Sequence, residues 1–183
     1  MIPRSGWISH GINLDEVESV ADHSFATSAL AMLVADGEVA HGRRINVERV
    51  LRLALLHDLA ETLTFDISKS YLQYLGDRGE AIKDELEISA WGYIIKSIHD
   101  DSIRSKYGAL HSEFNAEETL ESQIVHAADR LDILFQIIEY RRRGYPKGLL
   151  ADLWKSTNRK LTATRLTSVR DLQKIALHLY NVR

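Results

Sequence analysis

Residues 46–62 read NVERVLRLALLHDLAET, and this stretch decides how the chain folds. Apolar side chains dominate residues 50–56, as in a buried helix, and the pair His57-Asp58 follows directly. An imidazole and a carboxylate at the end of an apolar helical face cost desolvation free energy unless something compensates their polarity. Because consecutive helical residues point about 100° apart, both side chains can converge on one divalent metal ion, whereas on a strand they would diverge. Glu61, one turn on, shares the face of His57.

The composition indicates a single folded domain over residues 1–183, with 45% apolar residues. No apolar stretch is long enough to span a membrane, and residues 1–7 lack the apolar run of a secretory signal, so we expect a cytoplasmic protein. The absence of cysteine excludes disulfides, thiol nucleophiles and thiolate zinc sites, which leaves histidine and carboxylates for metal chemistry. A net charge of −3 gives no general attraction to nucleic acid or to anionic membranes, but a small anionic substrate remains possible.

Helical spacing of the apolar residues, together with only two prolines, predicts an all-α fold. Asp22 and Asn46 are the expected N-caps of the first two long helices, and Gly144 and Pro146 end the fourth. The segments 64–79 and 99–115 are richer in polar residues and glycine, so we expect loops with short helical pieces there. The expected helices span residues 24–39, 46–62, 81–98, 116–143 and 161–179.

Two further segments fit the metal hypothesis. Residues 18–23 place His23 at the start of the first long helix, and Asp129 follows two alanines on an apolar helix. Together with His57 and Asp58, they would supply four ligands from three helices and leave positions for water or substrate, as in catalytic metal sites. His126, one turn before Asp129, is a candidate to contact one of these ligands without binding the metal itself.

The order of these metal-ligand candidates closely resembles that of the HD-domain metal-dependent phosphohydrolases. Local matches within residues 4–140 make the chain similar to the 5'-deoxynucleotidase branch of that superfamily. In bacterial members the arginine and tryptophan can be adjacent, whereas Ser5 and Gly6 separate Arg4 from Trp7 here. The residues after about 140 carry no motif. The matches are Arg4-Ser5-Gly6-Trp7, residues 18–23, residues 57–61 followed by Asp66-Ile67, and residues 127–131.

The resemblance implies an HD-domain, phosphodiesterase-like helical bundle with the metal site between helices. Such an enzyme converts (deoxy)nucleoside 5'-monophosphates to nucleoside and phosphate through a metal-activated water. The resemblance further implies a homodimer and one divalent metal ion, with Mn, Co, Fe, Ni, Zn or Mg as candidates. The implied metal ligands are His23, His57, Asp58 and Asp129.

The resemblance also assigns roles to residues around the metal. Glu61 would orient the attacking water or accept its proton, and Arg4 would bind the phosphate and stabilise its charge during the reaction. Trp7 would shape the pocket around the sugar or base. The residues implied to line the sugar side are Asp66, Ile67, Ser68 and Lys69.

Each candidate, taken alone, also has a purely structural interpretation. His23 could merely begin a helix, Asp129 could pair with Arg130, and His57-Asp58 could form an internal ion pair. Likewise Glu61 could be a solvated helix residue, and Trp7 a packing anchor.

Two functional alternatives stay open. One is another HD hydrolase that acts on a phosphodiester, a nucleoside triphosphate or an alarmone, although the sequence has no second histidine cluster for a binuclear centre. The other is a non-catalytic nucleotide-binding regulator that keeps the ligands for stability. Glu61 and Asp66 argue against a regulator, because a purely structural metal site would not need them.

Overall fold

The molecule is built from helices, and the all-α prediction is confirmed. The structure is a computed structural model that describes the backbone of residues 1–182 and, within that range, every side chain except that of Lys69. Between residues 1 and 182 the only β-type pairing is an isolated bridge between Pro3 and Ser19. In chain order the elements are α1 (Ser5–Ser9), η1 (Leu14–Glu16), α2 (Val20–Ala40), α3 (Val47–Leu56), α4 (Glu61–Thr64), α5 (Lys69–Leu72), η2 (Gln73–Arg78), α6 (Gly79–Lys96), α7 (Asp101–Ala116), α8 (Leu120–Arg142), α9 (Ala151–Thr162) and α10 (Thr167–Asn181).

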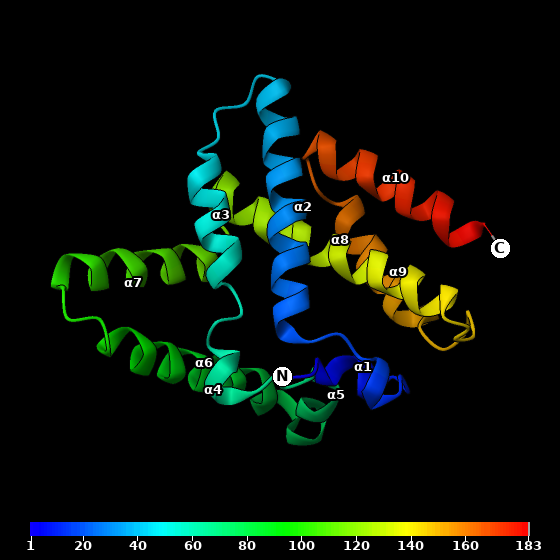
Figure 1. Cartoon of the computed structure of the whole chain (residues 1–183), viewed down its shortest axis with the longest axis horizontal. Coiled ribbons are helices and arrows are strands. Elements are labelled where there is room, and N and C mark those ends of the chain that lie inside the picture. The colour runs from blue at the N-terminus through cyan, green and yellow to red at the C-terminus, as the bar shows by residue number, and fades with distance from the viewer. Residues whose placement is uncertain (183) are drawn as a thin grey trace.

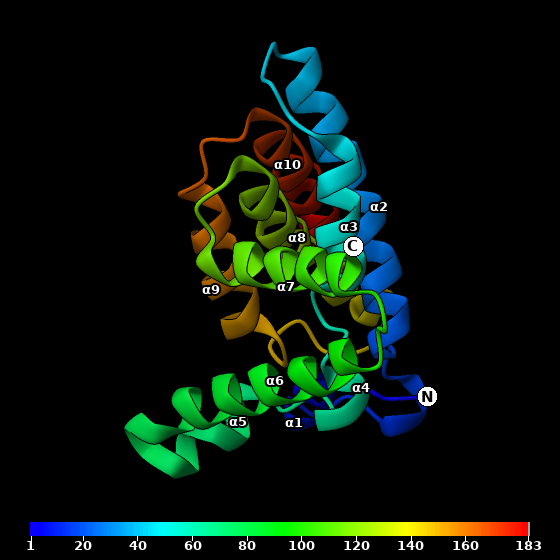
Figure 2. The ribbon, with the colours of Figure 1, turned by 90° about the vertical axis from the view of Figure 1, so that its left-hand side faces the viewer.

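Helices α2 and α8 cross at the centre, and the other long helices pack around this pair (Figure 1). Helix α3 packs on one side of α2, and α9 and α10 pack against α8 on the other side. The central helices bury Ala31, Ala35 and Ala128, small side chains that let packed helices approach closely. Helices α1, α4, α5 and α6 gather at the end of the molecule where α2 begins (Figure 2). None of the helices within residues 1–182 is both long and apolar enough to cross a membrane.

Helix α2 begins earlier than expected, because a capping box fixes its first turn. The Ser19 hydroxyl accepts a hydrogen bond from the Asp22 backbone N–H (3.1 Å), and the Asp22 carboxylate accepts one from the Ser19 backbone N–H (3.0 Å). Asp22 was wrongly predicted as the N-cap; Ser19 holds that position, and Asp22 is its partner in the box. His23 therefore lies in regular helix directly after the box.

The helix expected over residues 46–62 ends at Leu56, so that prediction was wrong at its C-terminal end. Asn46 caps its start as predicted, through a hydrogen bond that its side-chain oxygen accepts from the Arg49 N–H (3.0 Å). At the other end, Nδ1 of His57 lies 2.7 Å from the carbonyl oxygen of Ala54 and takes up an acceptor of the last helical turn. The chain then turns through residues 57–60 before α4 begins at Glu61.

Two other expected boundaries were wrong. The segment 99–115, expected as loops with short helical pieces, is instead almost entirely one helix, α7. Asp100 caps its N-terminus, and Tyr107, Leu110 and Phe114 are enough to give it an inward-facing apolar side. The last helix, expected over 161–179, begins only at Thr167 as α10, and α9 before it was not expected; the Arg170 side chain of α10 donates to the Thr164 carbonyl between the two helices (2.9 Å). The short helices α5 and η2 within 64–79 agree with the prediction for that segment.

Candidate metal centre and substrate cavity

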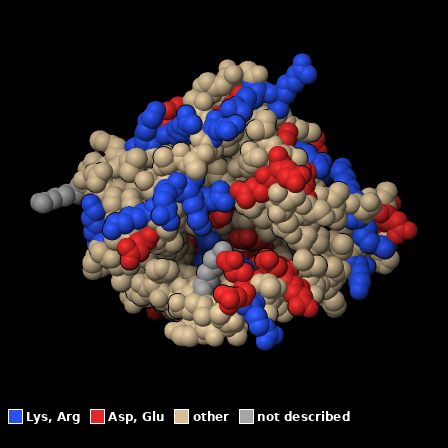
Figure 3. Space-filling model, turned by 180° about the vertical axis from the view of Figure 1, so that it is seen from behind, with Lys and Arg blue, Asp and Glu red and all other residues tan. Residues whose placement is uncertain are grey.

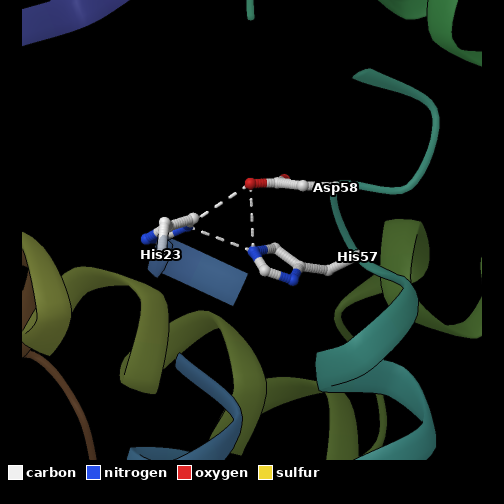
Figure 4. Close-up of side chains that lie close together, drawn as sticks. All are labelled: His23, His57 and Asp58. Carbon is white, nitrogen blue, oxygen red and sulfur yellow. Dashed lines mark hydrogen bonds and ion pairs between the residues drawn. The ribbon is translucent and has the colours of Figure 1, made fainter. Parts of the chain in front are cut away.

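Four predicted ligands come together where three elements meet. His23 projects from the start of α2, His57 and Asp58 follow the end of α3, and Asp129 lies within α8. Nε2 of His23 lies 3.2 Å from Nε2 of His57, 3.3 Å from Oδ2 of Asp58 and 3.3 Å from Oδ1 of Asp129. The side chains of His23, His57 and Asp58 point toward one another (Figure 4). The sequence order therefore corresponds to a real cluster in space.

The proton positions on the two imidazoles make this cluster suited to a cation. Nδ1 of His57 faces the Ala54 carbonyl, and Nδ1 of His23 lies 2.7 Å from Oδ2 of Asp132; both partners are acceptors, so both Nδ1 atoms carry the ring protons. In the neutral rings both Nε2 atoms are then acceptors, and they face each other and two carboxylate oxygens. Four converging acceptors repel one another unless a proton or a metal ion lies between them. Two imidazole nitrogens and two carboxylate oxygens fit a divalent transition metal.

The pKa shifts of His23 and Asp129 also indicate a site that favours positive charge. Burial and the nearby Arg4 both act to lower the pKa of His23, but hydrogen bonds to Asp129, Asp132 and Asp58 outweigh them and raise it well above its usual value. Burial acts to raise the pKa of Asp129, yet the hydrogen bond and charge of His23 lower it to about 2. The carboxylates thus favour positive charge at His23 Nε2, and a metal ion would have to displace that proton on binding.

Asp132 is a residue of the cluster that the sequence analysis missed. It is buried, lies one turn after Asp129 on α8, and holds the His23 ring by the Nδ1 contact. A second carboxylate at that spacing, on a helix that buries Ala128 and Leu131, was the signal that could have revealed it. His126, the expected outer contact, was the wrong residue: its ring stacks on Phe114 (centroids 4.2 Å apart) and its Nε2 lies 2.9 Å from the Phe114 carbonyl.

We expect Asp132→Asn to weaken divalent-metal affinity by about 10- to 100-fold, because the His23 ring would lose the carboxylate that fixes its orientation and raises its basicity. Isothermal titration of metal-stripped protein with Mn²⁺ or Co²⁺ measures this change. Asp152→Asn, at a fully exposed position on α9, is the matched control and should leave the affinity unchanged. Equal affinities for wild type and Asp132→Asn would mean that the Asp132 contact does not tune the metal site.

Glu61 lies beside the ligands as the first residue of α4. Its carboxyl is buried, and its Oε2 atom has no hydrogen-bond partner among the described residues. Burial, reinforced by the negative charges of Asp58 and Asp66, raises the pKa of Glu61 to about 9. A buried, unpartnered carboxyl beside the ligands has the surroundings of a group that exchanges protons.

A cavity of about 400 Å³ opens over the cluster. Seen from behind, the molecule has a hollow with basic side chains along one side of its rim and acidic side chains along the other (Figure 3). Predicted residues that line the cavity are Arg4, Trp7, Asp58, Glu61, Asp66, Ile67, Ser68 and Asp129. Lining residues that were not predicted are Gly6, His10, Ser70, Lys83, Arg130, Ile133, Leu153, Ser156, Thr157 and Lys160. The predicted role of Lys69 falls on a side chain outside the described ones.

Arg4 and Trp7 both line the cavity, and both contact Glu18. Nη1 of Arg4 lies 3.3 Å from Oε1 of Glu18, and the Trp7 indole N–H donates to the same oxygen (2.7 Å). Trp7 is also a packing anchor, because its buried ring meets Tyr140 edge to face at 5.1 Å. Arg4 Nη1 is 2.9 Å from Nδ1 of His23, and since both atoms are donors there, Glu18 is the group that holds the guanidinium.

The two residues that separate Arg4 from Trp7 hold the loop that carries Asp66. The Ser5 hydroxyl donates to the Asp66 carbonyl (2.6 Å) and accepts from the Ser68 N–H (3.0 Å). The Gly6 N–H donates to the Asp66 carboxylate (3.5 Å). Phe65, just before the loop, has φ +60°, which is strained for a side chain of this size. Gly6 therefore lines the cavity itself, and Ser5 holds in place the loop that forms part of its wall.

Comparisons with known proteins show the family to which the chain is similar. The sequence model of the HD-domain family matches residues 1–169. The 5'-deoxynucleotidase HDDC2 of Danio rerio is 31% identical over 159 residues, which are 87% of this chain and 72% of that protein. The Homo sapiens protein of the same name is 29% identical over 156 residues, which are 85% and 70% of the two chains.

Solved structures share the fold. A protein from Pyrococcus horikoshii superimposes with a TM-score of 0.78 at 28% identity, covering 97% of this chain and 92% of the other. A conserved hypothetical protein from Pyrococcus furiosus gives 0.73 at 30% identity with the same coverage. An HD-domain phosphohydrolase from Listeria innocua, 22% identical, gives 0.74 over 89% of this chain and 77% of its own.

Proposed function

The chain belongs to the HD-domain family, and from that premise we propose that it hydrolyses nucleoside 5'-monophosphates, with deoxy forms preferred, to nucleoside and phosphate. One observation carries the proposal: the acceptor atoms of His23, His57, Asp58 and Asp129 converge beside a cavity that Glu61 also lines. The relatives named 5'-deoxynucleotidase support the choice of substrate.

The residues present fit a divalent metal ion held by His23, His57, Asp58 and Asp129. When bound, such an ion supplies Lewis acidity, which lowers the pKa of a coordinated water and draws phosphate oxygens into place. Its charge would also offset the repulsion that Asp58 exerts on the Glu61 carboxyl. Glu61 would then be free to accept the proton of the attacking water and to fix its orientation.

Cations along the cavity would hold the phosphate. Arg4 presents a planar fork of donors, and the carboxylates around it keep it charged and in place. Lys83 of α6 is half-buried at the cavity wall and adds a second positive charge. Its ammonium group pairs with Glu87 (3.2 Å). Asp66, held in its loop, is positioned to accept hydrogen bonds from sugar hydroxyls, and Ile67 and Ser68 would line the same side.

The structure offers no support for a binuclear diesterase. Among the described residues, the only other group of potential ligands is Glu18, His23 and Asp132, which shares His23 with the first cluster. Its remaining carboxylates already bind Arg4, Trp7 and the His23 ring. A second metal ion would need further ligand atoms that are not already engaged in this way.

Phosphate release from a substrate panel tests the proposal. The panel contains ribo- and deoxyribonucleoside 5'-mono- and triphosphates and a generic phosphodiester, with metal-stripped protein resupplied with Mn²⁺, Co²⁺, Mg²⁺ or Zn²⁺. We expect metal-dependent release from 5'-monophosphates alone. Turnover only of the diester or triphosphates would replace the proposed substrate. Metal-dependent melting without any turnover would favour the nucleotide-binding regulator.

We further propose a homodimer that forms through the exposed face of α2. Phe25, Met32 and Leu33 lie along one side of this helix and are 76%, 40% and 56% exposed, and Leu55 of the adjoining α3 is 60% exposed. Apolar side chains gathered on a surface in this way favour contact with another protein surface. A second copy of the chain presents the same face, as a two-fold interface requires.

We expect Phe25→Glu to convert the dimer to monomer, since two opposed apolar surfaces would each acquire a charge that is costly to desolvate. Sedimentation velocity across a concentration series measures this shift. Leu14→Glu, at an apolar position on η1 that is 61% exposed, is the control and should stay dimeric. A wild-type protein that sediments as a monomer at every concentration would refute the interface.

A further inference from the structure

A second hollow, which we call the basic groove, adjoins the catalytic cavity. It has a volume of about 610 Å³ and lies between α8, the α9–α10 connection and the residues just after α2. Four cationic side chains line it: Arg43, Arg130, Lys160 and Arg165. Two of them, Arg130 and Lys160, also line the catalytic cavity. The two hollows are therefore neighbours that share a wall.

The basic groove holds positive charge that the protein itself does not neutralise. Arg43 pairs with the buried Glu38 (2.7 Å), and Arg130 pairs with Glu117 (3.2 Å), the only acidic residue in the groove lining. In the described part of the chain, no hydrogen bond or ion pair involves the side chains of Lys160 or Arg165, and both residues are exposed. In a chain of net charge −3, this is a local surplus of cations beside the active site. Lys and Arg side chains also continue from the rim of the hollow described above for the catalytic cavity over the neighbouring surface (Figure 3).

Apolar residues also line the basic groove. Ala127, Leu161 and Leu166 are nearly fully buried and form what we call its apolar floor, beside the polar Gln123 and Thr164. Cations around an apolar floor suit a ligand that combines a phosphate with a sugar or a base, rather than a bare inorganic ion. Arg130, which lines both hollows, directly follows Asp129 on α8.

We propose that the basic groove binds a second phosphate of a longer substrate, whose 5'-phosphate occupies the catalytic cavity. The ligand class is a nucleotide with a further phosphate beyond its sugar: a nucleoside 3',5'-bisphosphate or a 5'-phosphorylated dinucleotide. This inference rests on the proposed 5'-nucleotidase activity and extends its range of substrates. The shared wall favours one ligand that spans both hollows over two separate ligands, because Arg130 and Lys160 can contact either end.

The reaction itself is unchanged. Water attacks the 5'-phosphorus, the bond from phosphorus to the 5'-oxygen breaks, and a proton passes to that oxygen. The products are inorganic phosphate and a 5'-hydroxyl, and the second phosphate leaves intact on the product. The groove contributes by binding energy at a distance from the reacting bond.

The test compares kcat/KM for a deoxynucleoside 5'-monophosphate, its 3',5'-bisphosphate and the corresponding 5'-phosphorylated dinucleotide. We expect wild type to favour at least one of the two longer substrates by about tenfold, the value of one charge-assisted contact. Arg165→Gln should remove that preference and leave the monophosphate rate unchanged, since Arg165 does not line the catalytic cavity. Arg159→Gln, an equal change of charge on α9 outside both hollows, should keep the preference.

The arms of this experiment separate the possible failures. The second phosphate is terminal in the bisphosphate and carries another nucleoside in the dinucleotide, so the two rates tell these sources apart. Normal monophosphate turnover with no preference for either longer substrate would overturn the groove proposal alone. If no substrate is turned over, the proposed function fails and the groove proposal fails with it. A bisphosphate that alters monophosphate turnover without being hydrolysed would replace the spanning substrate with a separate effector.

Discussion

Replacing Asp58 by alanine is expected to abolish metal binding and phosphate release together. Its Oδ2 atom lies 3.3 Å from Nε2 of His23 and 3.2 Å from Nε2 of His57, so it is the carboxylate that contacts both imidazoles. Without it the cluster loses one ligand and half of its ligand charge. We expect kcat/KM for a 5'-monophosphate to fall by roughly a thousandfold or more, about 4 kcal/mol of transition-state stabilisation.

Metal content by mass spectrometry and initial rates of phosphate release measure the two effects on the same preparation. Asp36→Ala, at an exposed position on α2, is the control and should match wild type in both. Excess Mn²⁺ in the assay should not restore the rate of Asp58→Ala. If the variant keeps its metal and only the rate falls, Asp58 acts on the substrate instead of on the metal.

Glu61→Gln should have a different signature: metal bound as in wild type, and turnover reduced by about 10²- to 10⁴-fold. Glutamine keeps the size of the side chain but cannot accept the proton of the attacking water. The substitution should not destabilise the fold, because the carboxyl is buried and its Oε2 atom lacks a partner in the described structure. Thermal melting, with and without Mn²⁺, checks the fold in parallel with the rates.

Glu113→Gln provides a contrasting control for this variant. Glu113 also carries a carboxylate in a polar contact, with Arg49, but it lies away from the cavity. We expect this change to affect stability and to spare the rate per folded molecule. If Glu61→Gln lost metal as completely as Asp58→Ala, Glu61 would be a ligand and the division of roles proposed here would be wrong.

The fold class and the cluster of candidate metal ligands could be predicted from the sequence because both depend on local patterns. Helical periodicity identifies helices without knowledge of their partners, and the order of His23, His57-Asp58 and Asp129 resembles a known family. The structure places His57, Asp58 and Asp129 each within 3.3 Å of Nε2 of His23, and their role as ligands stays a prediction. The end of α3 was missed because the His57 ring itself takes up the Ala54 carbonyl, which periodicity cannot reveal.

Other features depended on contacts between distant segments. Asp132 gains its role only because α2 places the His23 ring against it. Lys160 lies in a part of the chain without motifs, and packing of α9 on α8 brings it to the cavity and the basic groove. Arg130 looked like a partner for Asp129, but its side chain pairs with Glu117 instead. No local pattern specifies such pairings, so sequence reasoning alone could not assign them.

The convergence of α2, α3 and α8 on one point also has a consequence for how this chain resists unfolding. The protein has no cysteine and therefore no disulfide, yet an ion held by His23, His57 and Asp129 would join segments that lie far apart in the sequence. Because such an ion would bind the folded state and leave on unfolding, it would add about 2.7 kcal/mol of stability when free metal is at 100 times its dissociation constant. The supply of metal would then set the lifetime of the folded molecule as well as its rate, and chelation would loosen the centre of the bundle before its periphery.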